Sequence, residues 1–154
     1  MRTKLTAIAA LAAAAVMLTA VASAGSAAAK QRVAIQVRGG VFFVLRPMTA
    51  GAIEPDTGTV SFCCWTQRSV TRDGQAIDIN NPQMTLTGKH GTLVARNQEG
   101  WIDVPDRVAI FTGTWKVISG TGDYAGLAGG GRGAGVQLAN GNIKAQFQGF
   151  LVPK

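Results

Sequence analysis

Two adjacent cysteines are the side chains with the most evident chemistry in this 154-residue sequence. Cys63 and Cys64 are its only cysteines. Neighbouring residues of an extended strand point to opposite faces, so a bond between their sulfur atoms requires a distorted backbone. Three states compete: a vicinal disulfide, an intermolecular bridge through Cys63, which would face outward beside Trp65, and two free thiols. A vicinal disulfide, if formed, is expected to be a rigid local clip rather than a redox centre.

The one histidine, His90, is the only candidate imidazole base. It lies in a bend between Gly88 and Gly91, and no Gly-x-Ser-x-Gly nucleophile motif accompanies it. We interpret it as a polar bend residue. Because His90 lies in a separate bend and no cysteine exists beyond the adjacent pair, we expect no metal site.

Three aspartates are candidates for acid–base chemistry. Asp103 and Asp106 flank Pro105, and Asp78 is expected to point outward from its strand. Paired carboxylates would have to face a cavity to do this chemistry. We expect these side chains to cap turns instead.

Two arginines are the main candidates for binding a ligand. Arg68 and Arg132 are both predicted on inward faces of strands, where an unpaired charge costs several kcal/mol. On one interpretation they anchor an acidic ligand inside an apolar barrel. On the other, each lies at a rim and extends its charge to solvent, or a bulge changes the register. Trp115 and Tyr124 are further ligand-binding candidates, weighed against ordinary core and corner positions.

The stretch around Trp115 predicts how these residues are held. Phe111, Trp115 and Val117 alternate with polar residues, which is the period of a half-buried strand. Glycines then follow at every second position from 129 to 135, and a helix tolerates glycine poorly. We therefore predict strand, tight turn, strand, with a sheet able to coil tightly.

Two glycine-containing pairs predict hairpins. Asp73-Gly74 favours a two-residue turn that sets Arg68 opposite Ile79. Asn140-Gly141 favours another. Its register pairs are Leu138 with Ile143, Val136 with Ala145, Ala134 with Phe147, and Arg132 with Gly149. The predicted inward faces consist of these side chains: Val60, Phe62, Cys64, Val70, Ile77 and Ile79 around the first hairpin, and Ala134, Val136, Leu138, Ile143, Ala145 and Phe147 in the second.

The remaining strand and turn boundaries complete the fold prediction. Strands are expected over residues 31–38, 41–45 and 59–72, and residues 46–58 are expected to form a loop that is a candidate lid. Residues 97–100 are expected to be a turn. About eight short strands without a helix indicate an all-β fold, a closed or nearly closed antiparallel β-barrel.

Residues 113–115 and 120–129 resemble the signature of the allene oxide cyclase and dirigent-like β-barrel superfamily, in the form that small secreted bacterial proteins carry. The resemblance implies an eight-stranded barrel with an apolar cavity and no cofactor. Its plant members are often trimeric, and they cyclise an oxygenated fatty acid or steer the coupling of phenoxy radicals. Their catalytic residues do not map onto this sequence, so no activity is carried over.

The N-terminus reads as a secretory signal peptide over residues 1–29, with cleavage after Ala24 or Ala29. Residues 30–154 then form a single barrel domain, secreted or held in the cell envelope. They carry thirteen basic and eight acidic side chains. The basic residues are scattered, so we expect no nucleic-acid partner and at most weak attraction to anionic surfaces. A homo-oligomer is compatible with the sequence.

Three functions follow from these observations. The first is a secreted barrel that binds a small apolar, amphipathic or acidic molecule. The second is a cofactor-free isomerase or cyclase of the resembled superfamily, and the third is an interaction protein with a filled barrel. A cavity of roughly 300 Å³ or more would favour the first two. An ionisable side chain with a shifted pKa pointing into that cavity would favour the second over the first. We expect the binding protein and lean against an enzyme.

Overall fold

The computed structural model describes residues 29–154, so all but the last residue of the expected signal peptide lies outside it. Ten strands and two short 3-10 helices make up the fold. In chain order they are β1 (Gln31–Arg38), β2 (Phe42–Pro47), β3 (Asp56–Cys63), β4 (Gln67–Arg72), β5 (Gln75–Asn80), β6 (Gln83–Gly88), β7 (Gly91–Val104), η1 (Pro105–Arg107), β8 (Val108–Gly120), η2 (Gly122–Tyr124), β9 (Leu127–Gln137) and β10 (Ile143–Pro153). Among the described residues no helix is long and apolar enough to cross a membrane.

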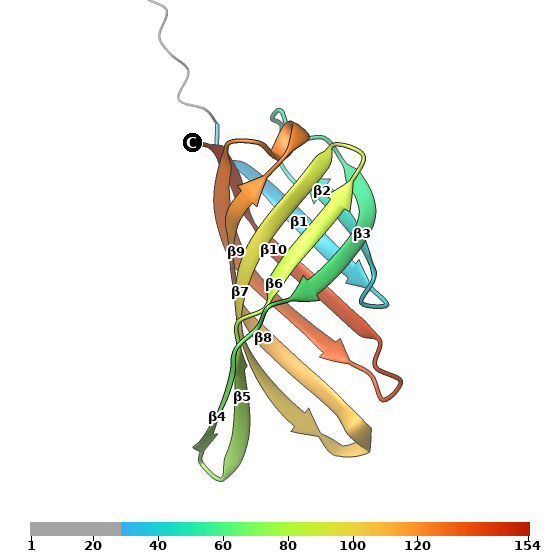
Figure 1. The fold of residues 1–154 in the computed structure, drawn as a ribbon, viewed down its shortest axis with the longest axis vertical. Helices are drawn as coiled ribbons and strands as arrows, with labels where there is room; N and C mark the ends of the chain where they lie inside the picture. Colours follow the sequence, from blue (N-terminus) through green and yellow to red (C-terminus); the bar gives the residue numbers. More distant parts are fainter. Residues whose placement is uncertain (1–28) are drawn as a thin grey trace, which may run out of the picture.

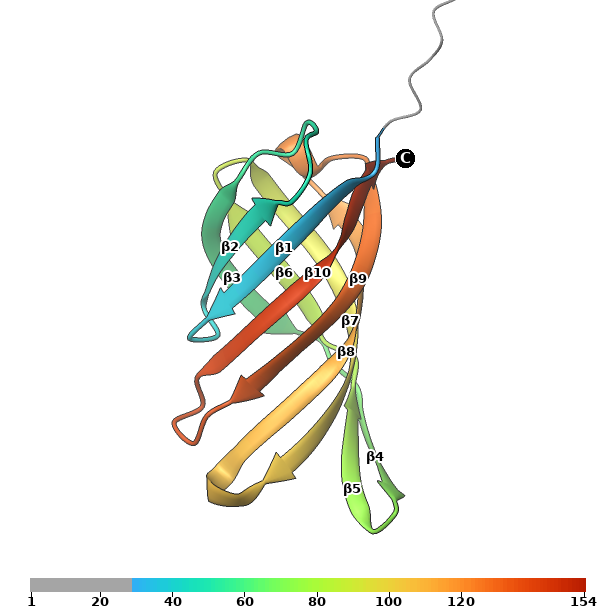
Figure 2. The ribbon, with the colours of Figure 1, turned by 180° about the vertical axis from the view of Figure 1, so that it is seen from behind.

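Eight of the strands close into an antiparallel barrel, as predicted (Figure 1; Figure 2). The ring runs β1–β2–β3–β6–β7–β8–β9–β10 and closes where β10 pairs with β1. Strands β4 and β5 form a hairpin outside the ring, attached through β5 to the second half of β7. We call the end of the barrel from which this hairpin projects the mouth; it is the lower end in Figure 1.

The core fills the barrel through strict alternation. On β1, the side chains of Val33, Ile35 and Val37 are buried, while the intervening residues are more exposed. Phe111, Trp115 and Val117 of β8 are buried in the same way, as the sequence predicts. Burying each such side chain contributes about 1.5–3 kcal/mol. The ring is therefore held by its inner face.

The β9–β10 hairpin has a register one residue away from the prediction. Ile143 pairs with Gln137, Phe147 with Gly133, and Gly149 with Gly131. The turn is longer than two residues: Gly141 N–H donates to Leu138 O, Leu138 N–H donates to Asn142 O, and Gly141 has a φ of 82°. A shift of one residue reverses which face of a strand is inward. On β9 the glycines therefore face the core, whereas β10 keeps its predicted inward face.

The glycines of β9 make room for aromatic rings. A β-carbon at Gly133 would collide with the ring of Phe147, and one at Gly135 with the ring of Phe111. At Gly149 of β10, a β-carbon would come within 2.7 Å of the Trp115 ring. The glycine pattern thus serves core packing as well as coiling of the sheet.

The β4–β5 hairpin has the predicted pairing but the opposite facing. Arg68 pairs with Ile79, as expected. However, Asp78 is opposite Trp101 and Asn80 is opposite Glu99, so these polar residues share the inner face of β7. Ile77 and Ile79 lie on the other side, near Gly100. The inward placement predicted for Ile77, Ile79 and Val70 is wrong because the hairpin lies beyond the barrel core; all six residues of β4 are exposed.

Three segment boundaries also differ from the prediction. Residues 97–100 are not a turn but the middle of β7, which pairs with β8 from Leu93 to Val104. Residues 59–72 are not one strand, because the chain leaves the extended conformation at Cys64, which has a φ of 57°. The irregular segment between β2 and β3 covers only residues 48–55.

A buried carboxylate organises the end of the barrel opposite the mouth. Asp56 accepts hydrogen bonds from the Tyr124 hydroxyl at 2.8 Å and from the backbone N–H groups of Thr57, Lys89 and His90 at 2.8, 2.9 and 3.3 Å. Burial alone would raise the pKa of Asp56, but these bonds outweigh it and hold the pKa below its usual 3.8. The carboxylate thereby ties η2 and the β6–β7 turn to β3.

Candidate functional site

The mouth of the barrel holds a cavity of about 360 Å³. It forms where β7 and β8 extend beyond the β1–β2 turn and the β4–β5 hairpin stands beside them (Figure 1; Figure 2). Its lining comes from both sides of this opening: Phe62, Trp65, Gln67, Asp78, Asn80, Pro82, Glu99, Trp101, Asp103, Ala109, Phe111, Gln137 and Ile143. The candidate lid, residues 46–58, contributes no described lining residue.

One wall of the cavity is aromatic. Trp101 and Phe111 are opposite each other on β7 and β8, and their rings stack with centroids 4.3 Å apart and planes inclined by 19°. Phe62 contributes from the end of β3, and Trp65, which is 57% exposed, from the connection to β4. The cavity therefore offers flat apolar surfaces to a ligand.

Glu99 is the buried ionisable residue in this lining. Only 4% of its surface is exposed. Its Oε1 accepts a hydrogen bond from Asn97 Nδ2 at 2.8 Å, and its Oε2 accepts one from Trp101 Nε1 at 3.0 Å. Burial raises the pKa of Glu99 above its usual 4.5, and the two hydrogen bonds only partly offset this.

Alternation along β7 brings these groups together. Asn97, Glu99 and Trp101 occupy successive inward positions. Opposite Glu99 on β8 is Gly113, which has no side chain to compete for the space. Asn97 is fully buried, and its Oδ1 has no hydrogen-bond partner. A buried acceptor of this kind is costly unless a donor reaches it.

The chemistry of the lining is acidic and aromatic. Asp78 and Asp103 join Glu99, and the described lining residues include no lysine or arginine. The Asp78 carboxylate accepts a hydrogen bond from the Ser69 hydroxyl across the β4–β5 hairpin. Within residues 29–154, no group of three His, Cys, Asp or Glu side chains is placed to hold a metal ion. The lining thus combines flat apolar surfaces with three carboxyl groups.

Comparison with protein-family models, curated proteins and solved structures finds no match for this chain. The resemblance to the allene oxide cyclase and dirigent-like superfamily therefore stays a prediction. The barrel itself is established by the strand pairing.

Arg68 and Arg132 are exposed, so the prediction that they face inward is wrong. Arg68 lies on β4, outside the ring, and Arg132 was misplaced by the one-residue shift of the β9–β10 register. Neither is among the residues that line the cavity. Any role for them in binding a ligand stays a prediction for the outer surface.

Trp115 and Tyr124 are core residues. Trp115 is buried and its Nε1 donates to the Gln148 carbonyl oxygen at 3.3 Å. Tyr124 is buried against Asp56, and burial, together with its bond to this carboxylate, raises the pKa of the hydroxyl. Neither residue lines the mouth cavity.

The other polar candidates lie at both ends of the barrel. His90 is in the β6–β7 turn, where its Nδ1 is 2.9 Å from Asp123 Oδ2 at the end opposite the mouth. Asp106 is in η1 with a φ of 68°. Asp78 and Asp103 line the cavity, so the prediction that Asp78 points outward is wrong.

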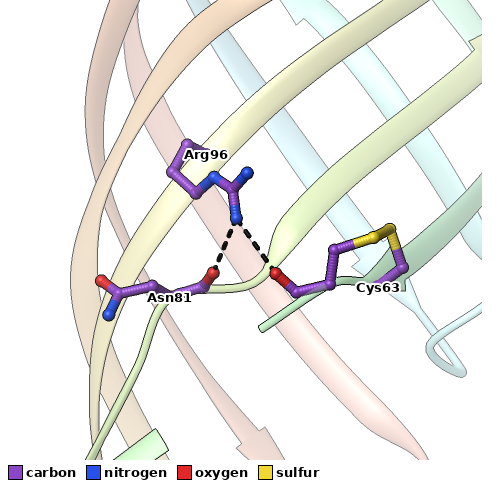
Figure 3. Close-up of a disulfide and its surroundings, with 4 residues drawn as sticks. Cys63, Asn81 and Arg96 are labelled. Carbon is purple, nitrogen blue, oxygen red and sulfur yellow. Dashed lines mark hydrogen bonds between the residues drawn. A yellow bond between two sulfur atoms is a disulfide. The ribbon is translucent and has the colours of Figure 1, made fainter. Parts of the chain in front are cut away.

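Cys63 and Cys64 are joined in a vicinal disulfide at the rim of the mouth (Figure 3). Arg96 Nη1 donates to the carbonyl oxygens of Cys64 and Asn81 at 3.1 and 3.2 Å. These carbonyls belong to the two connections by which the chain leaves β3 for the hairpin and returns to β6. The arginine thus holds both ends of the projecting hairpin against β7.

Sequence reasoning missed Asn97 and Glu99, the two most buried polar residues near the cavity. Interpreting residues 97–100 as a turn removed them from consideration. No local signal marked them, because both inward residues are polar and the alternation of burial from Leu93 to Trp101 is a feature of the structure.

Proposed function

We propose that this protein binds a small molecule with an apolar or amphipathic body in the mouth cavity, without a cofactor. The observation that carries the proposal is the stacked Trp101–Phe111 wall beside the buried Glu99. A volume of about 360 Å³ lies within the range of small-molecule sites, which are mostly apolar with a few placed polar groups. A filled barrel that acts only through its outer surface is less compatible with such a cavity.

We propose further that the protein acts outside the cytoplasm. Support comes from the basic start, apolar middle and small-residue end of residues 1–29. The Cys63–Cys64 disulfide fits an oxidising compartment.

A second candidate function is a cofactor-free isomerase or cyclase, in line with the family resemblance. Glu99 supports it, because a buried carboxyl group with a raised pKa in a cavity is suited to general acid–base catalysis. Native mass spectrometry of protein purified from culture medium distinguishes the candidates. If the protein leaves the co-purified compound chemically unchanged, the result supports binding. If the protein converts the compound and the Glu99→Gln variant does not, the result supports catalysis.

The binding proposal is tested by titration with the neutral dye Nile red. Trp65→Ala removes an exposed aromatic lining residue and is expected to weaken dye binding about three- to tenfold. Phe42→Ala is the matched control, since Phe42 is equally exposed but is not part of the lining. Equal effects of the two substitutions, or no dye binding at all, would contradict a site in the mouth.

A further inference from the structure

The mouth cavity has a charge opposite to that of the chain. Residues 30–154 carry a net positive charge, yet three of their eight acidic side chains, Asp78, Glu99 and Asp103, line this one cavity. They come from β5 and β7, and no described lysine or arginine lines the cavity with them. Low-dielectric walls concentrate the field of such a group of carboxylates inside the opening.

None of the side chains that the structure describes forms an ion pair with Glu99. The two ion pairs among the described residues join Arg72 to Asp73 and His90 to Asp123, both away from Glu99. Its two hydrogen bonds come from neutral donors. An ionised carboxylate accepts about four hydrogen bonds, so acceptor capacity remains unused.

A second buried acceptor lies next to this carboxylate. Asn80, which pairs with Glu99 across β5 and β7 and lines the cavity, has a buried Oδ1 without a partner. Carboxylate and amide oxygens side by side require donors, and a ligand that brings both N–H groups and positive charge satisfies them together. A carboxylate ligand would be repelled by the three acidic side chains of the lining.

The aromatic wall suits the same kind of ligand. Trp101 and Phe111 stack beside Glu99, and Trp65 stands at the rim. The faces of aromatic rings attract cations, most strongly for tryptophan. Acidic groups with aromatic surfaces are the chemistry by which proteins recognise organic ammonium ions.

We propose that the natural ligand of the mouth cavity is an organic cation, a primary amine in its ammonium form attached to an aromatic or short apolar body. The inference rests on the proposed binding function and names its ligand class. It differs from the acidic ligand that one interpretation of Arg68 and Arg132 suggested, because neither arginine lines the cavity.

The test is isothermal titration of the purified protein with three probes of matched shape. These are 2-phenylethylamine, which is a cation at neutral pH, neutral 2-phenylethanol, and the anion 3-phenylpropanoate. The amine is expected to bind at least about tenfold more tightly than the alcohol, and the carboxylate most weakly. Benzyltrimethylammonium, which has no N–H, measures how much of the preference is due to charge alone.

Two variants test whether Glu99 causes the preference for the amine over the alcohol. Glu99→Gln is expected to bring the amine and the alcohol to nearly equal affinity without abolishing alcohol binding. Glu54→Gln, the same chemical change at an exposed residue outside the lining, is expected to leave the preference intact. If Glu99→Gln does not fold, Asp103→Asn at an exposed lining residue is expected to reduce the preference by a smaller factor.

The outcomes separate this inference from the function on which it rests. Equal or tighter binding of the alcohol or the carboxylate by the unmodified protein would overturn the cation, while the binding function would stand. Amine binding that Glu99→Gln or Asp103→Asn leaves unchanged would also overturn it. Failure of every probe, with Nile red still bound, would count against the cation alone. Failure of the dye as well would remove the binding function.

Discussion

The ring of Phe147 lies against the inner face of Gly133, in the volume that a β-carbon at residue 133 would occupy. Gly133→Ala is therefore expected to destabilise the protein by about 1–3 kcal/mol, the usual cost of overpacking a core. Urea denaturation measures the change.

Gly100→Ala is the control for this prediction. A β-carbon at residue 100 would meet Ile77 and Ile79 at ordinary contact distances of 3.6 and 3.9 Å, so the free energy of unfolding should change by no more than about 0.5 kcal/mol. Phe147→Leu should restore part of the stability lost in Gly133→Ala. A Gly133→Ala protein as stable as the parent would show that the ring is not confined by β9.

Loss of the Tyr124 hydroxyl should destabilise the protein through Asp56. Tyr124→Phe removes one of four hydrogen bonds to a buried carboxylate, and bonds to charged groups contribute about 1.5–3 kcal/mol. Guanidinium denaturation at neutral pH measures the loss. An unchanged midpoint would show that the three backbone donors suffice.

The same pair predicts an acid transition. The folded pKa of Asp56 is below its usual 3.8, so its contribution to stability is complete above that value and is lost as the pH falls through the folded pKa. Tyr124→Phe raises the folded pKa toward 3.8 and should make acid unfolding begin at higher pH. Fluorescence during an acid titration measures the transition, and identical acid curves for the two proteins would contradict this prediction.

Glu99→Gln should stabilise the protein at neutral pH. The folded pKa of Glu99 is above 4.5, so the folded state binds more protons than the unfolded chain in the window between the two values, and stability falls as pH rises through it. A glutamine avoids this penalty. If the Asn97 amide rotates, its Oδ1 accepts from the new Nε2–H, so the bond between residues 97 and 99 is kept with donor and acceptor exchanged.

Melting temperatures at neutral pH and below 4.5 test the prediction. The advantage of Glu99→Gln should be present at neutral pH and shrink below 4.5. Asp78 and Asp103, the other carboxyl groups of the lining, are present in both proteins and cancel in the comparison. A constant difference at all pH values would contradict a raised pKa at Glu99.

Arg96→Ala should loosen the projecting hairpin without opening the barrel. The substitution removes the two hydrogen bonds to Cys64 and Asn81 that hold the connections of the hairpin. Amide hydrogen exchange in β5 should become faster, while exchange in β1 stays unchanged. Arg132→Ala, at an exposed position on β9, is the control and should change neither.

Most of the barrel could be predicted from the sequence because alternation and turn residues act locally. The spacing of Phe111, Trp115 and Val117 correctly gives the inner face of β8. The register at Asn140-Gly141 could not be predicted with the same success, because a glycine with positive φ serves both two- and three-residue loops. This one-residue difference in the β9–β10 register places Arg132 on the outer face of the barrel.

The candidate site was harder to predict because polar residues there follow tertiary pairing rather than local preference. Asn97 and Gly100 have the composition of a turn, but β5, β6 and β8 pair along β7 and keep it extended. The β4–β5 hairpin likewise exposes an apolar face and turns Asp78 toward the mouth. Rules that place apolar side chains inward fail beyond the edge of a core.

β3 and β6 pair directly, as far as Cys63 opposite Gln83, before the chain departs for β4. Closure of the ring therefore does not depend on the excursion between them. Hairpins of other lengths and compositions can therefore be grafted between residues 64 and 82 on an unchanged scaffold, so the side chains that the hairpin adds to the cavity lining can be varied separately from the folding of the cylinder.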